Sequence, residues 1–220
     1  TLSTSPVTIT VPAATSAGGG SGYITVSNGN GCTSGSTSTF TVTVNALPTI
    51  ALSGSAASVC YSVSSQTTTL PYSGTTNTPT TYSINWDSSP SNSFVTVSNA
   101  TLSTSPVTIT VPAATSAGIY TGYLTVRNGN GCTSGSTNTF TVTVNAIPTT
   151  TYELTPVSCF GGNDGKIKIT GAGGTGSYYF SINNGTNFTI TPETTHTFTG
   201  LSANTFTIRV KDMNGCVSVP

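Results

Sequence analysis

The chain contains an internal repeat with a period of 100 residues. Residues 1–50 match residues 101–150 at that offset, and only positions 19, 20, 21, 24, 27, 38, 47 and 50 of the first copy differ. This period exceeds the roughly 20 to 50 residues of solenoid repeats and equals the roughly 100 residues of a whole β-sandwich domain. The repeat therefore predicts a tandem array of domains, each folded around a core of its own.

Two prolines mark the ends of the repeated segments. The sequences NALPTI and NAIPTT place Pro48 and Pro148 soon after a strand-like segment, and a proline cannot continue a hydrogen-bonded ladder. One complete repeat is therefore expected at residues 48–147. Residues 1–47 are expected to be the C-terminal half of a preceding copy, and residues 148–220 a smaller domain of another type.

Charged residues are scarce and unevenly placed. They make up 5% of the chain, against about 25% in ordinary soluble domains. Residues 1–150 hold only Asp87 and Arg127, which supports a change of domain type after residue 147. The formal net charge is zero and no basic run is present, so the sequence predicts no nucleic-acid partner. No segment approaches the roughly 18 apolar residues of a membrane span, and direct membrane insertion is not expected.

Apolar and polar residues alternate with a period of two, which is typical of half-buried strands. In TFTVTV, residues Phe140, Val142 and Val144 share one face and threonines the other, and VTITV at residues 107–111 repeats the pattern. Asn-Gly pairs and Gly-rich segments supply the residues that tight hairpins require. The sequence therefore predicts an all-β chain.

Two aromatic residues favour an immunoglobulin-like sandwich for residues 48–147. Trp86 alternates with Tyr82 and Ile84, as a core tryptophan of the third strand would, and Tyr120 has the placement of a tyrosine corner. We therefore expect immunoglobulin-like sandwiches arranged as beads in a rod, followed by a smaller β-sandwich.

Five cysteines beside one histidine favour disulfides over zinc, and hence an extracellular setting. Cys60 and Cys132 are the two cysteines of the complete repeat, so they are predicted to pair. Cys159 and Cys216 form a second pair by elimination, and the partner of Cys32 is expected upstream of residue 1. A bridge that closes a loop of this size stabilises by about 4 kcal/mol in the chain-entropy model.

Motifs that could carry chemistry have simpler structural interpretations. The sequence GAGGTG at residues 171–176 fits a dinucleotide-binding pattern, but a strand-like segment follows it where that pattern needs a helix. The lone His196 lacks the partners of a hydrolytic triad and is interpreted as an exposed strand or loop residue. The sequence therefore predicts no catalytic residues, no cofactor and no enzymatic activity.

Two groups of residues could in principle bind a ligand. Asp164 and Asp212 could offer oxygen ligands to calcium, but Asp in a Gly-containing turn more often binds its own backbone, so no metal site is predicted. Tyr178 and Phe180 are expected to be buried together. Tyr179 alone is then exposed, where a carbohydrate-binding platform would present several rings.

Two resemblances cover nearly the whole chain. Residues 48–147 resemble the PKD-like and immunoglobulin-like repeats of very large Bacteroidetes surface proteins, with a late Gly-x-Tyr, Asn-Gly-x-Gly-Cys and Thr-Val-Thr-Val-Asn-x-x-Pro. Residues 155–219 resemble the SprB repeat through VSCFGGNDGKIKIT, GGTGSYYFSINNG, FTGL and TIRVKDMNGC, with Phe206 where that family usually has Tyr. These resemblances imply gliding-motility adhesins exported by the type IX secretion machinery.

The sequence thus predicts a structural or adhesive segment of a long, secreted cell-surface filament. The expected partners are surface or polysaccharide ligands, neighbouring repeats of the same chain, and the secretion or gliding machinery. The alternative is a carbohydrate-binding or spacer module of an exported hydrolase, because sandwich repeats also serve as spacers in exported enzymes.

Overall fold

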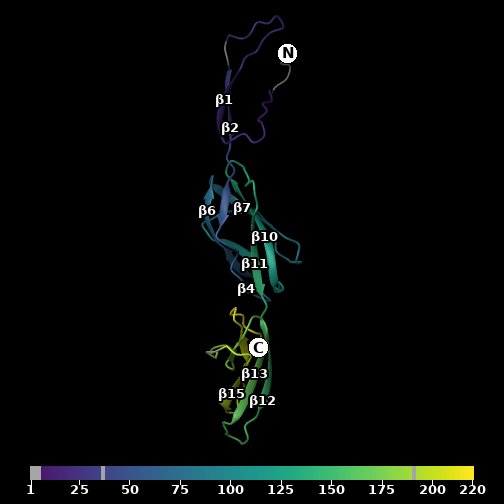
Figure 1. Ribbon diagram of the computed structural model, residues 1–220, viewed down its shortest axis with the longest axis vertical. Helices are drawn as coiled ribbons and strands as arrows, with labels where there is room; N and C mark the ends of the chain where they lie inside the picture. Colours follow the sequence, from purple (N-terminus) through teal and green to yellow (C-terminus); the bar gives the residue numbers. More distant parts are fainter. Residues whose placement is uncertain (1–5, 36–37, 190–191) are drawn as a thin grey trace.

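The computed structural model describes residues 6–35, 38–189 and 192–220, and its regular structure there consists entirely of β-strands. Three parts follow one another along the long axis of the molecule (Figure 1). We call them the N-terminal segment (residues 1–47), the central unit (48–147) and the C-terminal unit (148–220). The central and C-terminal units each have a separate hydrophobic core. The prediction of an all-β fold is confirmed.

The N-terminal segment forms a single antiparallel hairpin. Its strands are β1 (Gly18–Ile24) and β2 (Ser38–Val44), paired from Gly18 opposite Val44 to Ile24 opposite Ser38. The repeated sequence in the central unit pairs in the same register, displaced by 100 residues. The repeat therefore encodes this hairpin locally, whatever packs against it.

The central unit is a β-sandwich of two layers. One layer is a five-stranded sheet in the order β4-β11-β10-β7-β8, and the pairs β3-β6 and β5-β9 form the other. Its core combines Ile84, Leu124 and Val142 of the first layer with Leu70 and Ile109 of the second. The strands are β3 (Thr49–Leu52), β4 (Val59–Cys60), β5 (Gln66–Leu70), β6 (Tyr72–Thr76), β7 (Pro79–Trp86), β8 (Val97–Thr101), β9 (Val107–Val111), β10 (Gly118–Asn128) and β11 (Asn138–Asn145).

The alternating pattern of the sequence matches the buried faces of this sandwich. Phe140, Val142 and Val144 of β11 are buried, while the threonines between them are only half-buried. Strand β9 alternates in the same way between buried and exposed residues. The predicted division of these strands into a core face and a polar face is confirmed, because burial of every second side chain is what a half-buried strand requires.

The tyrosine corner predicted for the central unit is confirmed, and Trp86 packs against the core while remaining partly exposed. Trp86 stacks on Phe94 with ring centroids 4.1 Å apart and meets the ring of Phe140 edge-on at 5.5 Å. The buried Tyr120 donates its hydroxyl proton to the backbone carbonyl of Ser116 at 2.7 Å, as a tyrosine corner does.

The C-terminal unit is a smaller sandwich. A three-stranded sheet in the order β12-β13-β15 faces the pair β14-β16, and Ile167, Ile169, Tyr178, Phe180 and Val210 form the core between them. Residues 171–173 of the glycine-rich segment end β13, and residues 174–176 lead towards β14. Because β13 pairs with β12 and β15 while β14 pairs with β16, the segment connects two sheets and is not the turn of a hairpin. The strands are β12 (Pro148–Thr155), β13 (Gly165–Gly173), β14 (Tyr179–Ser181), β15 (Thr195–Leu201) and β16 (Arg209–Lys211).

The connections between consecutive parts are very short. Strand β11 ends at Asn145 and β12 begins at Pro148, whose side chain is fully buried. At the other junction, the side-chain amides of Asn77 and Asn128 donate hydrogen bonds to the carbonyls of Leu47 (2.7 Å) and Ala46 (3.2 Å). Each part therefore directly follows its neighbour along the long axis of the molecule (Figure 1).

Replacing Gly122 by alanine should destabilise the central unit by about 1 to 3 kcal/mol, because a Cβ atom there would overlap the Phe140 ring in a packed core. The matched control is Gly129→Ala, where a Cβ meets no atom within 4 Å. Urea unfolding followed by the fluorescence of Trp86, the one tryptophan in the chain, measures both variants. Equal midpoints for the two variants would contradict this packing.

Candidate functional site: a disulfide between units

A disulfide joins the central unit to the C-terminal unit. It links Cys60 of β4 to Cys216 near the end of the chain, with the two Cα atoms 5.5 Å apart. Cys32, Cys132 and Cys159 are unpaired. The predicted pairs Cys60–Cys132 and Cys159–Cys216 are therefore wrong.

Cys60 and Cys132 cannot pair because they lie at opposite ends of the central unit. Cys60 is opposite Asn145, the last residue of β11, and so faces the C-terminal unit. Cys132 precedes the first residue of β11 and lies 4.0 Å from the carbonyl oxygen of Asn45 in the N-terminal segment. The eight residues of β11 span about 25 Å at about 3.3 Å per residue. A disulfide requires Cα atoms within about 7 Å.

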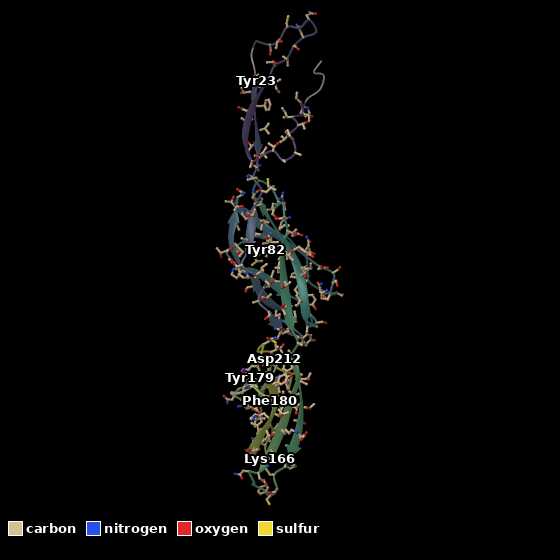
Figure 2. All side chains as sticks on the ribbon, in the orientation of Figure 1. Tyr23, Tyr82, Lys166, Tyr179, Phe180 and Asp212 are labelled. Atoms are coloured by element: carbon tan, nitrogen blue, oxygen red, sulfur yellow. A yellow bond between two sulfur atoms is a disulfide. The ribbon has the colours of Figure 1, made fainter. Side chains whose placement is uncertain are left out.

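The same geometry separates Cys159 from Cys216. Strand β12 runs the length of the C-terminal unit, from Pro148 at the junction to Thr155 opposite Lys166. Cys159 follows it at the far end, whereas Cys216 follows Asp212 beside the central unit. Figure 2 shows Asp212 at the near end of the unit and Lys166 at the far end.

Cys216 is held in place by a turn built on the buried carboxylate of Asp212, which is 1% exposed. Its Oδ1 accepts hydrogen bonds from the backbone N–H groups of Asn214 (3.0 Å) and Cys216 (2.8 Å). Its Oδ2 accepts one from the N–H of Thr175 (2.9 Å) in the glycine-rich turn. The carboxylate thus ties the cysteine turn to the loop that ends β13.

The sequence Asx-x-x-Gly-Cys-x-Ser forms the same turn in all three parts of the chain. The Oδ1 of Asn128 accepts the N–H of Cys132 at 3.0 Å, and that of Asn28 accepts the N–H of Cys32 at 3.1 Å. In each turn the Asx N–H also donates to the cysteine carbonyl, at 2.9 to 3.0 Å. Sequence reasoning missed this shared turn, although the spacing of NGNGCTS and DMNGCVS carries the signal.

The two aspartates considered for calcium lie at opposite ends of the C-terminal unit. Asp212 is occupied by the three backbone N–H groups described above. Asp164 accepts the N–H of Ser158 at 3.0 Å, and hydrogen bonds from the side chain and backbone of Ser158 hold the pKa of Asp164 below its ordinary value. Within the described ranges, no three His, Cys, Asp or Glu side chains gather as metal ligands.

His196 lies on strand β15 rather than in an exposed loop, and its side chain is only half-exposed. Its Nδ1 is 3.0 Å from the carboxylate of Glu193, and its ring packs edge-on against Phe198 at 4.6 Å. The structure thus places His196 at the edge of the core, between the rings of Phe180 and Phe198. Of the two expected settings, strand or loop, the structure shows the strand, and the side chain is less exposed than expected.

Tyr178 and Phe180 are buried, as predicted, and Tyr179 is half-exposed. The ammonium group of Lys211 lies 4.9 Å from the centroid of the Tyr179 ring and 4.7 Å from that of Phe188. The Lys211 ammonium group therefore lies over the Tyr179 ring and the Phe188 ring together. The part of the chain that the structure describes also contains no helix long and apolar enough to cross a membrane.

Peptide mapping without reduction should show Cys60 linked to Cys216. After denaturation and thiol alkylation, trypsin should produce residues 1–127 with Cys60 and an alkylated Cys32, 128–166 with Cys132 and Cys159, and 212–220 with Cys216. We expect residues 1–127 and 212–220 to remain joined until a reductant is added, and residues 128–166 to be released. Retention of residues 128–166 on residues 1–127 would instead support the pair Cys60–Cys132.

Replacing Asp212 by asparagine should loosen the C-terminal unit, because the amide N–H₂ would face the N–H of Thr175 and leave it unsatisfied. A lost hydrogen bond to a buried charged group costs about 1.5 to 3 kcal/mol, so protected amides of this unit should exchange about tenfold to a hundredfold faster. Asp164→Asn makes the same chemical change at an exposed site and is the control. Equal exchange in the two variants, measured by mass spectrometry, would refute this role of Asp212.

Comparison with known proteins gives one family match and distant structural likenesses. Solved structures with some similarity include a chimeric titin Z1Z2 functionalised with a decorin peptide, the human desmocollin-1 ectodomain and the amphioxus IgVJ-C2 molecule. The titin chimera is 16% identical over 77% of this chain and 92% of that chain, with a TM-score of 0.33. Desmocollin-1 is 10% identical over 84% and 38%, with a TM-score of 0.30, and IgVJ-C2 is 14% identical over 73% and 95%, with a TM-score of 0.25.

No curated protein matches the chain. The family match falls on the start of the C-terminal unit, from within β12 to the turn after β14. Residues 151–187 of the chain match the family model of the SprB repeat.

Proposed function

We propose that the chain is a structural and adhesive segment of a long filament on the cell surface, serving attachment and gliding motility. The observation that carries the proposal is the junction between the central and C-terminal units, where the continuous backbone and the Cys60–Cys216 disulfide both cross from one unit to the next. A filament that transmits force needs such junctions.

The disulfide makes the junction a double covalent connection. The backbone crosses through Ala146 and Ile147, and the disulfide crosses from β4, which pairs in parallel with the end of β11. Two connections at different points resist bending that a single short linker would permit. The bridge spans 156 residues of sequence, and in the chain-entropy model it stabilises the folded state by about 5 kcal/mol.

Chemistry and family both support an extracellular place for this segment. Disulfides persist in oxidising surroundings outside the cell, and the match to the SprB repeat fits the expected gliding adhesins. The surface is rich in Ser and Thr and poor in charge, so contacts with a substratum or polysaccharide would be hydrogen-bonded and individually weak. Many repeats along one filament would then supply avidity.

Antibody fragments raised against this chain test the proposal on native cells. Immunogold electron microscopy should label long, thin threads that project from the cell surface. The same monovalent fragments should reduce attachment of the cells to glass, compared with fragments against an unrelated surface protein. Label confined to a globular particle, with attachment unchanged, would contradict the proposal and favour the spacer of an exported hydrolase.

A further inference from the structure

We propose that consecutive repeats of this array are joined by disulfides in one continuous series. The cysteine at the position of Cys60 in one repeat bonds to the turn cysteine of the next, as Cys60 bonds to Cys216. Cys132 is then the attachment point for the preceding repeat, and Cys159 for the following one. The inference depends on the arrangement of repeats and not on what the filament binds.

The turns that hold Cys132 and Cys216 are the same structure. In both, the Asx Oδ1 accepts the cysteine N–H, the Asx N–H donates to the cysteine carbonyl, and the glycine N–H donates to the Asx carbonyl. In both, the serine two residues after the cysteine closes the turn, because its backbone N–H donates to the carbonyl of Val126 or Val210. The turn that presents a bonded sulfur in the C-terminal unit therefore presents Cys132 in the central unit.

Cys132 also lies beside the residue of the preceding repeat that is equivalent to the neighbour of Cys60. In the formed disulfide, Cys60 is opposite Asn145, and the N–H of the following Tyr61 donates to the Asn145 carbonyl at 2.8 Å. The residue equivalent to Asn145 in the preceding copy is Asn45, displaced by 100 positions. The Sγ of Cys132 is 4.0 Å from the carbonyl oxygen of Asn45. A cysteine placed beside Asn45 as Cys60 is beside Asn145 would therefore meet Cys132.

Cys159 has a position along the C-terminal unit similar to that of Cys60 in the central unit. Each comes after the first strand of its unit, β3 or β12, although Cys60 is part of the short strand β4 and Cys159 lies in a bend. Cys159 is exposed at the end away from the central unit. Each unit thus carries one cysteine at each end, which is the arrangement that a series of links between neighbours requires. A link within one unit is excluded by the strand lengths given above.

The bonds form by ordinary thiol–disulfide chemistry with a small-molecule disulfide such as oxidised glutathione as oxidant. The thiolate of one cysteine attacks that disulfide and releases one glutathione thiolate. The second cysteine thiolate then attacks the mixed disulfide and releases the other. Two protein thiols are oxidised to one protein disulfide, and one small disulfide is reduced to two thiols.

The test adds residues 48–100 in front of residue 1, which completes the first repeat because residues 1–47 correspond to residues 101–147. The extended chain, folded in a glutathione buffer, has an added cysteine equivalent to Cys60. We expect that cysteine to bond to Cys132, so that alkylation of the denatured protein finds two thiols, those of Cys32 and Cys159. Trypsin without reduction should leave residues 128–166 and 212–220 both attached to the large N-terminal fragment.

Single substitutions identify the partner. Cys132→Ser should release residues 128–166 and raise the thiol count from two to three, although one cysteine has been removed. Cys159→Ser and Cys32→Ser should keep residues 128–166 attached and lower the count to one. Trp fluorescence confirms that each variant folds. Release of residues 128–166 from the unsubstituted extended chain, or their retention in Cys132→Ser, would overturn the proposal.

Discussion

The disulfide between Cys60 and Cys216 depends on the positions of two short backbone segments, strand β4 and the Asp212 turn. Parallel pairing with the end of β11 brings Cys60 to one end of the central unit, and the Asp212 turn brings Cys216 to the facing end of its neighbour. Neither position would be fixed without the sandwich cores, since the hairpin β10-β11 and the strand β13 set the length of each unit. The disulfide can therefore form only when both units are folded and meet at their shared junction.

Uncharged or singly charged Asn and Asp side chains hold the turns throughout the molecule. With charged residues at 5% of the sequence, the turns are held by Asn and Asp side chains that bond backbone N–H groups. Asp212 is the deeply buried member of this set, and its three hydrogen bonds compensate for the loss of solvent. At the equivalent position, the side-chain amide of Asn128 donates a hydrogen bond to the carbonyl of Ala46. The Asn128 side chain thus holds the cysteine turn through its Oδ1 and contacts the N-terminal segment through its amide N–H.

Much of this fold could be predicted from the sequence, because period-two alternation and the placement of Trp86 and Tyr120 report directly on local strand faces. The cysteine pairing could not be predicted from the number of cysteines in each repeat, because that prediction assumes that every disulfide lies within one repeat. The length of β11 keeps Cys60 and Cys132 apart, and only the topology shows which end each occupies. The shared Asx-x-x-Gly-Cys spacing was present in the sequence, but its meaning depended on knowing that the turn faces the neighbouring unit.

Force-clamp spectroscopy on the oxidised chain, held by its two ends, tests most directly whether one disulfide spans the junction. With both units unfolded under force, the Cys60–Cys216 bridge still hides the chain between these cysteines, a sequence separation of 156 residues. At about 3.5 Å per extended residue, a thiol reductant should release about 550 Å in a single step. Two shorter steps, as separate bridges within each unit would produce, or no step at all, would contradict this account.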